Sequence, residues 1–313
     1  MKPKKILSSV AIAFVAVMTM VSCNQNDDIT PDGPQPIQFT AGIGEQAVAT
    51  PQTRATGTNW QQYDAIGVFM LKNKETNIAG TYAANKKFTV STGSLFLPLS
   101  GHEIYYPLDE NDPVDFIAYY PYTDGLNMDS KIDVITTDQS KQPDFDMMWA
   151  KADNNGEGYN KNYNNNIPLT FSHRLARLTM NIKAAANTAL VDLDGMVVTI
   201  TGMNTATTFA VRDGSIGTPS AVAPFTARKT NTTIGGGYLA TYDAIIIPAK
   251  YANGAVTVTF TVHQQTFTWI VDAAEFASGS DYVYEVILTL TGVKATGTIT
   301  PWITVDKGPV YAE

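Results

Sequence analysis

Several carboxylates have the residue type and the spacing that acid–base chemistry on a sugar would need. They are Asp109, Glu110, Asp112, Asp115, Asp144 and Asp146. A glycosidase holds two carboxyl groups about 5 to 10 Å apart, and alternate residues on one strand reach that separation. However, the segment from Asp109 to Asp112 runs directly into Pro113, which is typical of a turn that leads into a strand. The sequence therefore favours structural carboxylates, and we predict no catalytic residue and no enzymatic activity.

Histidine and cysteine, which supply most zinc and redox sites, are scarce in this chain. The three histidines, His102, His173 and His263, lack His-x-x-x-His spacing, and His173 is typical of a hydrogen-bonded structural residue. With a single cysteine, Cys23, the chain can form neither an internal disulfide nor a cysteine metal site. Residues 124–129 contain acids but lack the closing glutamate of a calcium loop. We therefore predict no metal and no cofactor.

Cys23 stands in a context that indicates a modification rather than catalysis. Residues 1–5 are basic, residues 6–21 are apolar, and residues 24–28 are polar and end in two acids. A secretory signal has this layout, and a cysteine at the cut resembles the bacterial lipoprotein signal, in which the thiol is acylated. The acidic pair is similar to the surface-export tag of Bacteroidetes-type lipoproteins. We therefore predict a signal peptide over 1–22, lipidation of Cys23 and a surface-exposed lipoprotein of the outer membrane; a plain cleaved signal is the alternative.

The overall charge excludes one class of partner. The chain carries 21 basic and 29 acidic residues, a formal net charge of −8. A nucleic-acid-binding surface needs clustered lysine and arginine, and the sequence has no such cluster, so we predict no nucleic-acid partner. The roughly 290 residues after the signal are enough for two domains of ordinary size, each stabilised by its buried core.

The elements that must position these residues are strands. Apolar residues alternate with polar ones over 177–183, 256–262 and 282–290, whereas residues 114–120 are mostly apolar on both faces, with Asp115 as the exception. Threonine, valine, isoleucine and tyrosine dominate these runs, and their side chains suit a pleated sheet. Glycine turns such as Asp124-Gly125 separate the runs. The pattern predicts an all-β protein built of stacked β-sandwiches.

An asparagine-rich segment suggests where the chain divides. Residues 153–166 contain almost nothing that could be buried, and asparagine and glycine favour exposed loops. We place a boundary near Ile167, which gives an N-terminal domain over 55–166 and a C-terminal domain over 167–313. A long hairpin loop inside a single domain is the alternative.

The region ahead of the first domain combines a short strand with a flexible segment. Every second residue from Ile37 to Ile43 is apolar, which predicts a strand. Residues 45–57 are small and polar, with Arg54 at their centre. Exposed segments of this kind are preferred sites of proteolysis, so the bond between Arg54 and Ala55 is a candidate processing site. A merely solvated arginine is the alternative.

Short blocks of sequence along the chain resemble, in order, the signature of the fimbrillin-like (Mfa-like, FimA-type) proteins of Bacteroides and Porphyromonas. The blocks are Thr53-Arg54-Ala55-Thr56, Thr58-Asn59-Trp60, and residues 64–70, 104–107, 114–122, 137–140, 146–150, 169–178 and 297–302. Any single block is a weak signal. Their order over residues 53–302, behind a lipoprotein-like signal, makes the resemblance specific.

This resemblance implies a subunit of a type V pilus or a close relative, with two transthyretin-like β-sandwiches in tandem. It implies that an arginine-specific or trypsin-like protease cuts after Arg54. Residues 23–54 would then be a lipidated propeptide with a removable strand, replaced by a strand from a neighbouring subunit. In the resembled family the donor is a C-terminal segment, and here apolar residues alternate from Ile299 to Val305. The same tail could be the last strand of its own domain, and both readings stay open.

We therefore predict a structural subunit of surface fimbriae that supports adhesion. Its expected partners are other fimbrial subunits, the outer membrane through the lipid before processing, and a host protein or glycan receptor. Two alternatives stay open: an uncleaved anchor subunit, and a monomeric anchored lipoprotein that binds glycan or host protein. The tyrosines between Tyr105 and Tyr122 could stack on sugars, although aromatic residues beside strands more often fill a core.

Overall fold

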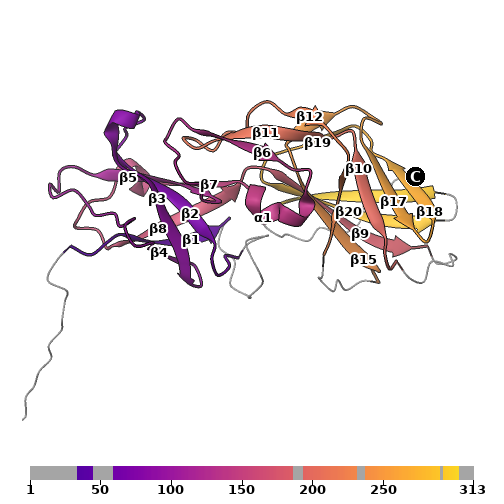
Figure 1. Cartoon of the computed structure of the whole chain (residues 1–313), viewed down its shortest axis with the longest axis horizontal. Coiled ribbons are helices and arrows are strands. Elements are labelled where there is room, and N and C mark those ends of the chain that lie inside the picture. Colours follow the sequence, from indigo (N-terminus) through magenta and orange to yellow (C-terminus); the bar gives the residue numbers. More distant parts are fainter. Residues whose placement is uncertain (1–33, 45–58, 186–192, 231–236, 290–291, 303–313) are drawn as a thin grey trace, which may run out of the picture. The chain divides into compact units, whose positions relative to one another are not determined.

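The computed structural model confirms an all-β protein (Figure 1). It describes residues 34–44, 59–185, 193–230, 237–289 and 292–302. The predicted signal peptide, Cys23, Arg54 and Ala55 lie outside these ranges. The short helical elements in the described part are α1 (Gln142–Phe145) and the 3-10 turns η1 (Ile78–Gly80), η2 (Gln139–Lys141) and η3 (Asn154–Gly156).

The first group of strands closes into a barrel in the order β1-β4-β3-β2-β5-β7-β8. The strands are β1 (Gln38–Ile43), β2 (Ala65–Lys72), β3 (Thr81–Thr92), β4 (Leu95–Pro98), β5 (Val114–Tyr120), β7 (Met148–Ala152) and β8 (Asn166–His173). Strand β1 closes the ring, because it pairs antiparallel with β4 and parallel with β8. A closed sheet has no free edge, so β1 is an interior strand although it is the first one that the structure describes.

Strand β5 explains why its sequence is apolar on both faces. All seven of its residues are buried. Phe116 and Ala118 face the core inside the barrel, whereas Ile117 and Tyr119 belong to a second cluster of buried residues. A strand covered on both faces has no solvent-exposed side, which confirms the expectation for residues 114–120.

The second group of strands forms two further sheets. One has the order β14-β15-β9-β20-β21 and the other the order β13-β10-β17-β18. Their bounds are β9 (Ala176–Ala184), β10 (Val197–Thr201), β13 (Phe225–Thr226), β14 (Arg228–Lys229), β15 (Ala240–Ile246), β17 (Thr257–Val262), β18 (Gln265–Ile270), β20 (Ser280–Thr289) and β21 (Gly292–Pro301). Strands β9, β17 and β20 confirm the three alternating runs found in the sequence.

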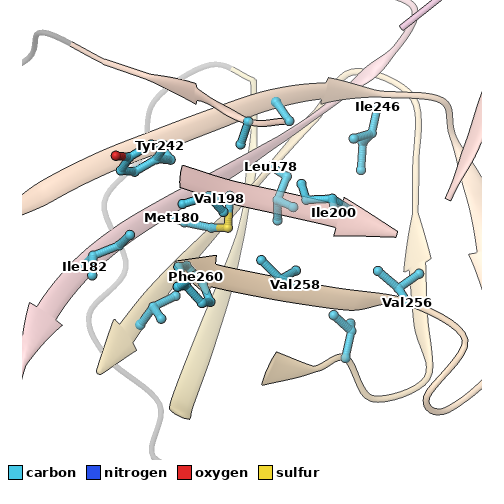
Figure 2. Packing of buried hydrophobic residues seen from close by; sticks show 14 of the residues in the cluster. Leu178, Met180, Ile182, Val198, Ile200, Tyr242, Ile246, Val256, Val258 and Phe260 are labelled. Atoms are coloured by element: carbon cyan, nitrogen blue, oxygen red, sulfur yellow. The ribbon is translucent and has the colours of Figure 1, made fainter. Parts of the chain in front are cut away.

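A large core forms where the apolar faces of these two sheets meet (Figure 2). Leu178, Met180 and Ile182 project from β9 toward Val198 on β10 and Phe260 on β17, and each of the five is at most 1% exposed. Alternation places every second side chain of a strand on one face of its sheet. The polar residues between them therefore lie on the opposite face.

Two small sheets complete the described part. Strand β6 (Lys131–Ile135) pairs with β11 (Asn204–Ala210), which also pairs with β12 (Ser220–Val222). Strand β16 (Ala249–Tyr251) pairs with β19 (Ala274–Phe276). The pairing of β6 with β11 joins segments on opposite sides of the predicted boundary near Ile167. Strand β8 begins at that boundary and completes the barrel, and the division into two domains stays a prediction.

Candidate functional site around the first strand

Strand β1 is deeply buried on one face. Ile37, Phe39 and Ala41 are 0% exposed and Ile43 is 5% exposed, as the alternation in the sequence predicts. Phe39 makes edge-to-face contacts with Phe88 on β3, at 4.8 Å between ring centroids, and with Phe116 on β5, at 5.3 Å. An aromatic pair of this geometry contributes about 0.5–1.5 kcal/mol beyond the burial of its surface. These side chains are therefore part of the barrel core and not a cover laid over it.

The main chain of β1 is hydrogen-bonded on both of its edges. On the β4 side, the Ala41 N–H donates to the Ser94 carbonyl at 2.9 Å. On the β8 side, six consecutive residues pair in register, from Gln38 with Asn166 to Ile43 with Phe171. A missing interior strand would leave two rows of backbone groups without their partners.

Trp60 binds β1 from outside the strand ladder. Its indole N–H donates to the main-chain carbonyl of Ala41, with 2.6 Å between nitrogen and oxygen. Its ring packs edge-on against Phe96, Tyr120 and Phe171, at centroid distances of 5.0, 5.4 and 5.2 Å. In the sequence, Trp60 stands out only as part of a family-like block. A tryptophan that closely follows the small, polar residues 45–57 was the available signal.

A short turn holds Trp60 in place. The carboxylate of Asp64 accepts hydrogen bonds from the Gln61 N–H at 2.8 Å and from the Tyr120 hydroxyl at 3.0 Å. The Asp64 N–H donates back to the Gln61 carbonyl at 3.0 Å. This buried carboxylate ties the turn that follows Trp60 to strand β5.

The last described strand, β21, has the opposite environment. It pairs with β20 along its whole length and lies at the edge of its sheet. Ile299 on this strand is 64% exposed. The tail therefore forms the last strand of its own sheet as far as Pro301. Residues 303–313, the remainder of the candidate donor segment, lie outside the described residues.

Beyond β21, the chain is pinned by Trp302, which is 3% exposed. Its indole stacks on the imidazole of His173, with 3.9 Å between centroids and 4° between planes. The Nδ1 atom of His173 lies 2.8 Å from Oδ1 of Asp146. Arg177 also lies over the Trp302 ring. His173 and Asp146 are thus brought together, in a buried structural contact that holds the end of β21.

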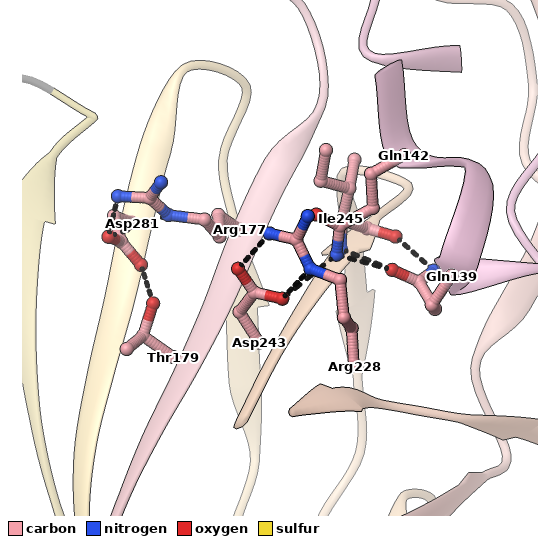
Figure 3. Close-up of polar contacts among 8 residues, drawn as sticks. All are labelled: Gln139, Gln142, Arg177, Thr179, Arg228, Asp243, Ile245 and Asp281. Atoms are coloured by element: carbon pink, nitrogen blue, oxygen red, sulfur yellow. Dashed lines mark hydrogen bonds and ion pairs between the residues drawn. The ribbon is translucent and has the colours of Figure 1, made fainter. Parts of the chain in front are cut away.

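A second polar cluster gives a structural role to the block of residues 137–140, which contains Gln139 (Figure 3). The side-chain amide of Gln139 donates to the Ile245 carbonyl at 2.9 Å and accepts from the Ile245 N–H at 2.8 Å. Gln142 donates to Asp243, whose carboxylate also accepts two hydrogen bonds from Arg228. Gln139 thus binds the backbone of β15 as a neighbouring strand would, so its role is structural.

Four of the candidate carboxylates accept hydrogen bonds from neighbouring protein groups. Asp115 accepts from the Asn73 side chain at 2.8 Å and from the Lys74 N–H at 3.0 Å. Asp112 accepts from the Tyr82 hydroxyl. Asp109 accepts from the N–H and the side chain of Asn111, and these bonds lower the pKa of this exposed carboxyl. Glu110 accepts from Asn162 at 3.0 Å.

In the possible calcium loop, residues 124–129, the acidic side chains also bind other protein groups. Asp129 forms an ion pair with Arg212, and Asp124 accepts hydrogen bonds from Gly125 and Tyr122. Within the described ranges, no group of three or more His, Cys, Asp or Glu side chains could hold a metal ion. In the same part of the chain, no helix is both long and apolar enough to cross a membrane.

The tyrosines around β5 divide between core and surface. Tyr119 and Tyr120 are buried, whereas Tyr105 is 45% exposed. Burial raises the pKa of Tyr119, and its hydroxyl lies within hydrogen-bonding distance of two acceptors, Oδ1 of Asn85 at 2.7 Å and the Thr123 carbonyl at 2.8 Å. Burial also raises the pKa of Tyr106. These phenols act mainly as core residues rather than as a platform for a sugar.

Known proteins resemble this chain over most of its length. Residues 53–302 match the sequence profile of a family described as fimbrillin-like. A Bacteroides uniformis protein provisionally named fimbrium subunit Fim1C is 31% identical over 302 residues, which is 93% of each chain. A solved Bacteroides uniformis structure, provisionally named a cell adhesion protein, has a TM-score of 0.67 and 28% identity, over 85% of this chain and 98% of its own. A similarly named Bacteroides ovatus structure shares the fold, with a TM-score of 0.62 and 22% identity over 88% of this chain and 100% of its own.

Proposed function

This chain belongs to the fimbrillin-like family, and from that premise we propose that it is a non-catalytic structural subunit of surface fimbriae. In this proposal the subunit assembles when β1 is removed and a strand of another subunit takes its place. One observation carries the proposal: β1 is an interior strand of a closed sheet, and the segment that joins it to β2 contains Arg54.

The proposed activation step is hydrolysis of the peptide bond after Arg54. Water adds across that bond, leaving a carboxylate on Arg54 and a new amino terminus on Ala55. Strand β1 then has no covalent link to the barrel, and only its hydrogen bonds and buried side chains retain it. The supporting observations are the small polar composition of residues 45–57 and the single arginine within it.

Loss of β1 creates a strong demand for a replacement. Burial of a side chain such as Ile37, Phe39 or Ile43 contributes about 1.5–3 kcal/mol, and these three are at most 5% exposed. Departure of the strand also opens the edges of β4 and β8, which are hazards for aggregation when they stay unpaired. A strand from a second subunit restores both the ladder and the core contacts.

Such a contact is head-to-tail, because the donor of one subunit fills the acceptor site of the next. Each added subunit leaves one further donor or acceptor site unused at the end, so the contact propagates a filament. We propose that the donor comes from the C-terminal region. Two features favour this region: among the described strands β21 is paired on one edge only, and the alternation of apolar residues continues from Ile299 to Val305.

The N-terminal segment gives the proposed route to the surface. We propose that residues 1–22 are a lipoprotein signal, that Cys23 is lipidated, and that the chain reaches the outer membrane as an exposed lipoprotein before processing. The basic, apolar and cysteine-containing sequence supports this step. We also propose that the barrel and the second group of strands correspond to two transthyretin-like domains.

The test uses a chain that begins at Asn24, treated with an arginine-specific protease and run unheated on a detergent gel. We expect Ala55 as the new N-terminal residue and a ladder of multimers that collapses on boiling. The matched control is Arg54→Lys, which keeps the charge and resists this protease, and it should stay monomeric. Resistance at Arg54 in the unmodified chain would favour an uncleaved anchor subunit. A cut that leaves only monomer would favour a monomeric glycan- or protein-binding lipoprotein.

A further inference from the structure

We propose that Trp60 recognises whichever strand fills the position of β1 by hydrogen bonding to its main chain, and that the packed core around Ala41 limits the size of one of its side chains. This inference rests on the proposed exchange of β1 and adds to it the chemistry that selects the incoming strand. Trp60 is suited to this role because it follows Arg54 in the sequence and so stays with the barrel after processing.

The hydrogen bond from Trp60 is made just beyond the end of β4, at the Ala41 carbonyl of β1. The N–H and C=O of one residue in an antiparallel pair face the same neighbour. The Ala41 N–H faces the β4 side, where it donates to Ser94, and β4 itself begins at Leu95. The Ala41 carbonyl accepts the indole N–H of Trp60 at 2.6 Å. Trp60 thus extends the hydrogen bonding of β4 by one donor.

This donor is held rigidly by groups that belong to the processed chain. Phe96 on β4, Tyr120 on β5 and Phe171 on β8 surround the Trp60 ring, at centroid distances of 5.0–5.4 Å. Asp64 fixes the turn that follows it. A preorganised donor pays little conformational entropy when it binds. Because it contacts a main-chain carbonyl, it can bind any extended strand, whatever its sequence.

Selectivity for side chains then comes from two inward-facing positions of the strand, those of Phe39 and Ala41. Phe39 fills a space between Phe88 and Phe116 that a large apolar side chain is needed to occupy. Ala41 is 0% exposed, so any atoms added to the side chain at this position would have to enter the packed barrel core. Next to it, a Cβ added at Gly42 would meet no atom within 4 Å. The site therefore takes an extended peptide, parallel to β8, with a large residue, then a small one, two positions apart.

Exchange of a synthetic β1 peptide tests the role of the indole N–H. The probe is a fluorescein-labelled peptide of residues 35–44, and the protein is the chain from Asn24 with a site for a highly specific protease inserted within residues 45–58. After the cut, labelled peptide replaces β1, and its release is followed in excess unlabelled peptide. Trp60→Phe keeps the aromatic packing but removes the donor, and we expect release about tenfold faster, as for the loss of one buried hydrogen bond.

The chain offers a matched control in Trp149, whose indole N–H donates to the Val211 carbonyl at 3.0 Å. Trp149→Phe removes the same kind of bond at another place and should leave peptide release unchanged. Equal release rates for the unmodified chain and Trp60→Phe would overturn the proposal, as would equal acceleration by both substitutions.

Variant peptides test the size limit independently of any change in the protein. Ala41→Leu in the peptide should reduce its affinity at least a hundredfold, because the extra atoms enter a packed core. Gly42→Leu, at the adjacent position, should bind within about threefold of the parent peptide, because the added side chain meets open space. Equal binding of the two variants would contradict the selectivity proposed for the Ala41 position.

Hydrogen–deuterium exchange on the uncut chain separates this inference from the proposed function. If the labelled peptide never replaces β1, strand replacement itself fails. The role of Trp60 is then judged from the amide hydrogens of residues 37–44 in the intact protein. Faster exchange in Trp60→Phe than in Trp149→Phe at these residues would support the proposed role of Trp60, and equal rates would overturn it.

Discussion

The first and last described strands, β1 and β21, differ in how strongly the fold holds them. Strand β1 is paired on both edges and its inward side chains are at most 5% exposed. Strand β21 is longer, with ten residues against six, yet it is paired on one edge and exposes Ile299. The length of a strand therefore says little about how much it contributes to the stability of the fold. That contribution depends on how many of its edges are paired and on how deeply its side chains are buried.

This difference gives the two strands complementary roles in the proposed assembly. An interior strand cannot leave without a substitute, because its departure opens two sheet edges and a core. An edge strand can detach while the other strands of its sheet stay paired with one another. In the proposed assembly the region around β1 is therefore the acceptor, and the region around β21 is the donor.

The largest expected effect comes from truncating one apolar residue on each strand. Phe39→Ala should lower the free energy of unfolding by about 3–5 kcal/mol, because it leaves a cavity beside Phe88 and Phe116. Ile299→Ala removes a side chain that is 64% exposed, and should change it by less than about 0.5 kcal/mol. Urea unfolding of both variants measures the two values. Equal losses would break the contrast between the strands.

A second, smaller contrast concerns two glycines that lie directly opposite tyrosines on paired strands. A Cβ at Gly67 would lie 2.2 Å from the ring of Tyr119, and one at Gly297 would lie 2.4 Å from the ring of Tyr284. Tyr119 is buried in the core, whereas Gly297 is on the edge strand and exposed. We expect Gly67→Ala to destabilise by about 1–3 kcal/mol, as for overpacking.

Gly297→Ala should have a clearly smaller effect, because the edge strand can shift outward. Thermal unfolding of the two variants, compared at the same pH and salt, measures the difference. A larger loss from Gly297→Ala would show that β21 is held more rigidly than its edge position suggests.

A third prediction concerns the anchor at the end of β21. Trp302→Leu keeps an apolar side chain but removes the stacking on His173 and the contact with Arg177. We expect a loss of about 0.5–1.5 kcal/mol, with faster amide hydrogen exchange confined to residues 292–302. The same experiment on β1 should show no change. Faster exchange across both strands would indicate that the anchor holds the whole fold and not only the edge strand.

The smallest effect is expected from pH. The hydrogen bond from Lys183 holds the pKa of Glu285 below its ordinary value of 4.5, and the two side chains are 2.8 Å apart. Because the fold favours the charged carboxylate, its contribution is complete above the unfolded pKa and is lost as pH falls through the folded pKa. Glu285→Gln should therefore destabilise by about 0.2–1 kcal/mol at neutral pH.

The difference between Glu285→Gln and the unmodified chain should shrink toward zero as the pH is lowered below 4.5. Urea midpoints at a series of pH values measure it. A difference that stays constant with pH would mean that the charge of Glu285 does not act through Lys183.

The sequence predicts the strands well where the signal is local. The alternation from Ile37 to Ile43 predicts β1, and the apolar residues on both faces of 114–120 predict a strand covered on both sides. Pairing partners are not local, so the sequence did not reveal that β6 pairs with β11 or that β1 closes the barrel between β4 and β8.

Side-chain roles were harder to predict for the same reason. Trp60 and Gln139 both act on the main chain of distant segments, at Ala41 and Ile245. A backbone carbonyl or N–H leaves no mark in the sequence of the residue that carries it. Such contacts became visible only once the fold had placed the segments side by side.

The most direct test of the central claim is to lock β1 in place. Thr40 on β1 lies directly opposite Leu95 on β4, a spacing that suits an engineered disulfide. A chain that begins at Asn24 lacks the single cysteine, Cys23, so Thr40→Cys and Leu95→Cys introduce the only thiols. After cleavage at Arg54, the oxidised chain should stay monomeric, and the same sample should form multimers once the disulfide is reduced. Equal assembly of the oxidised and reduced chains would contradict the account, because filament growth would then not require β1 to leave.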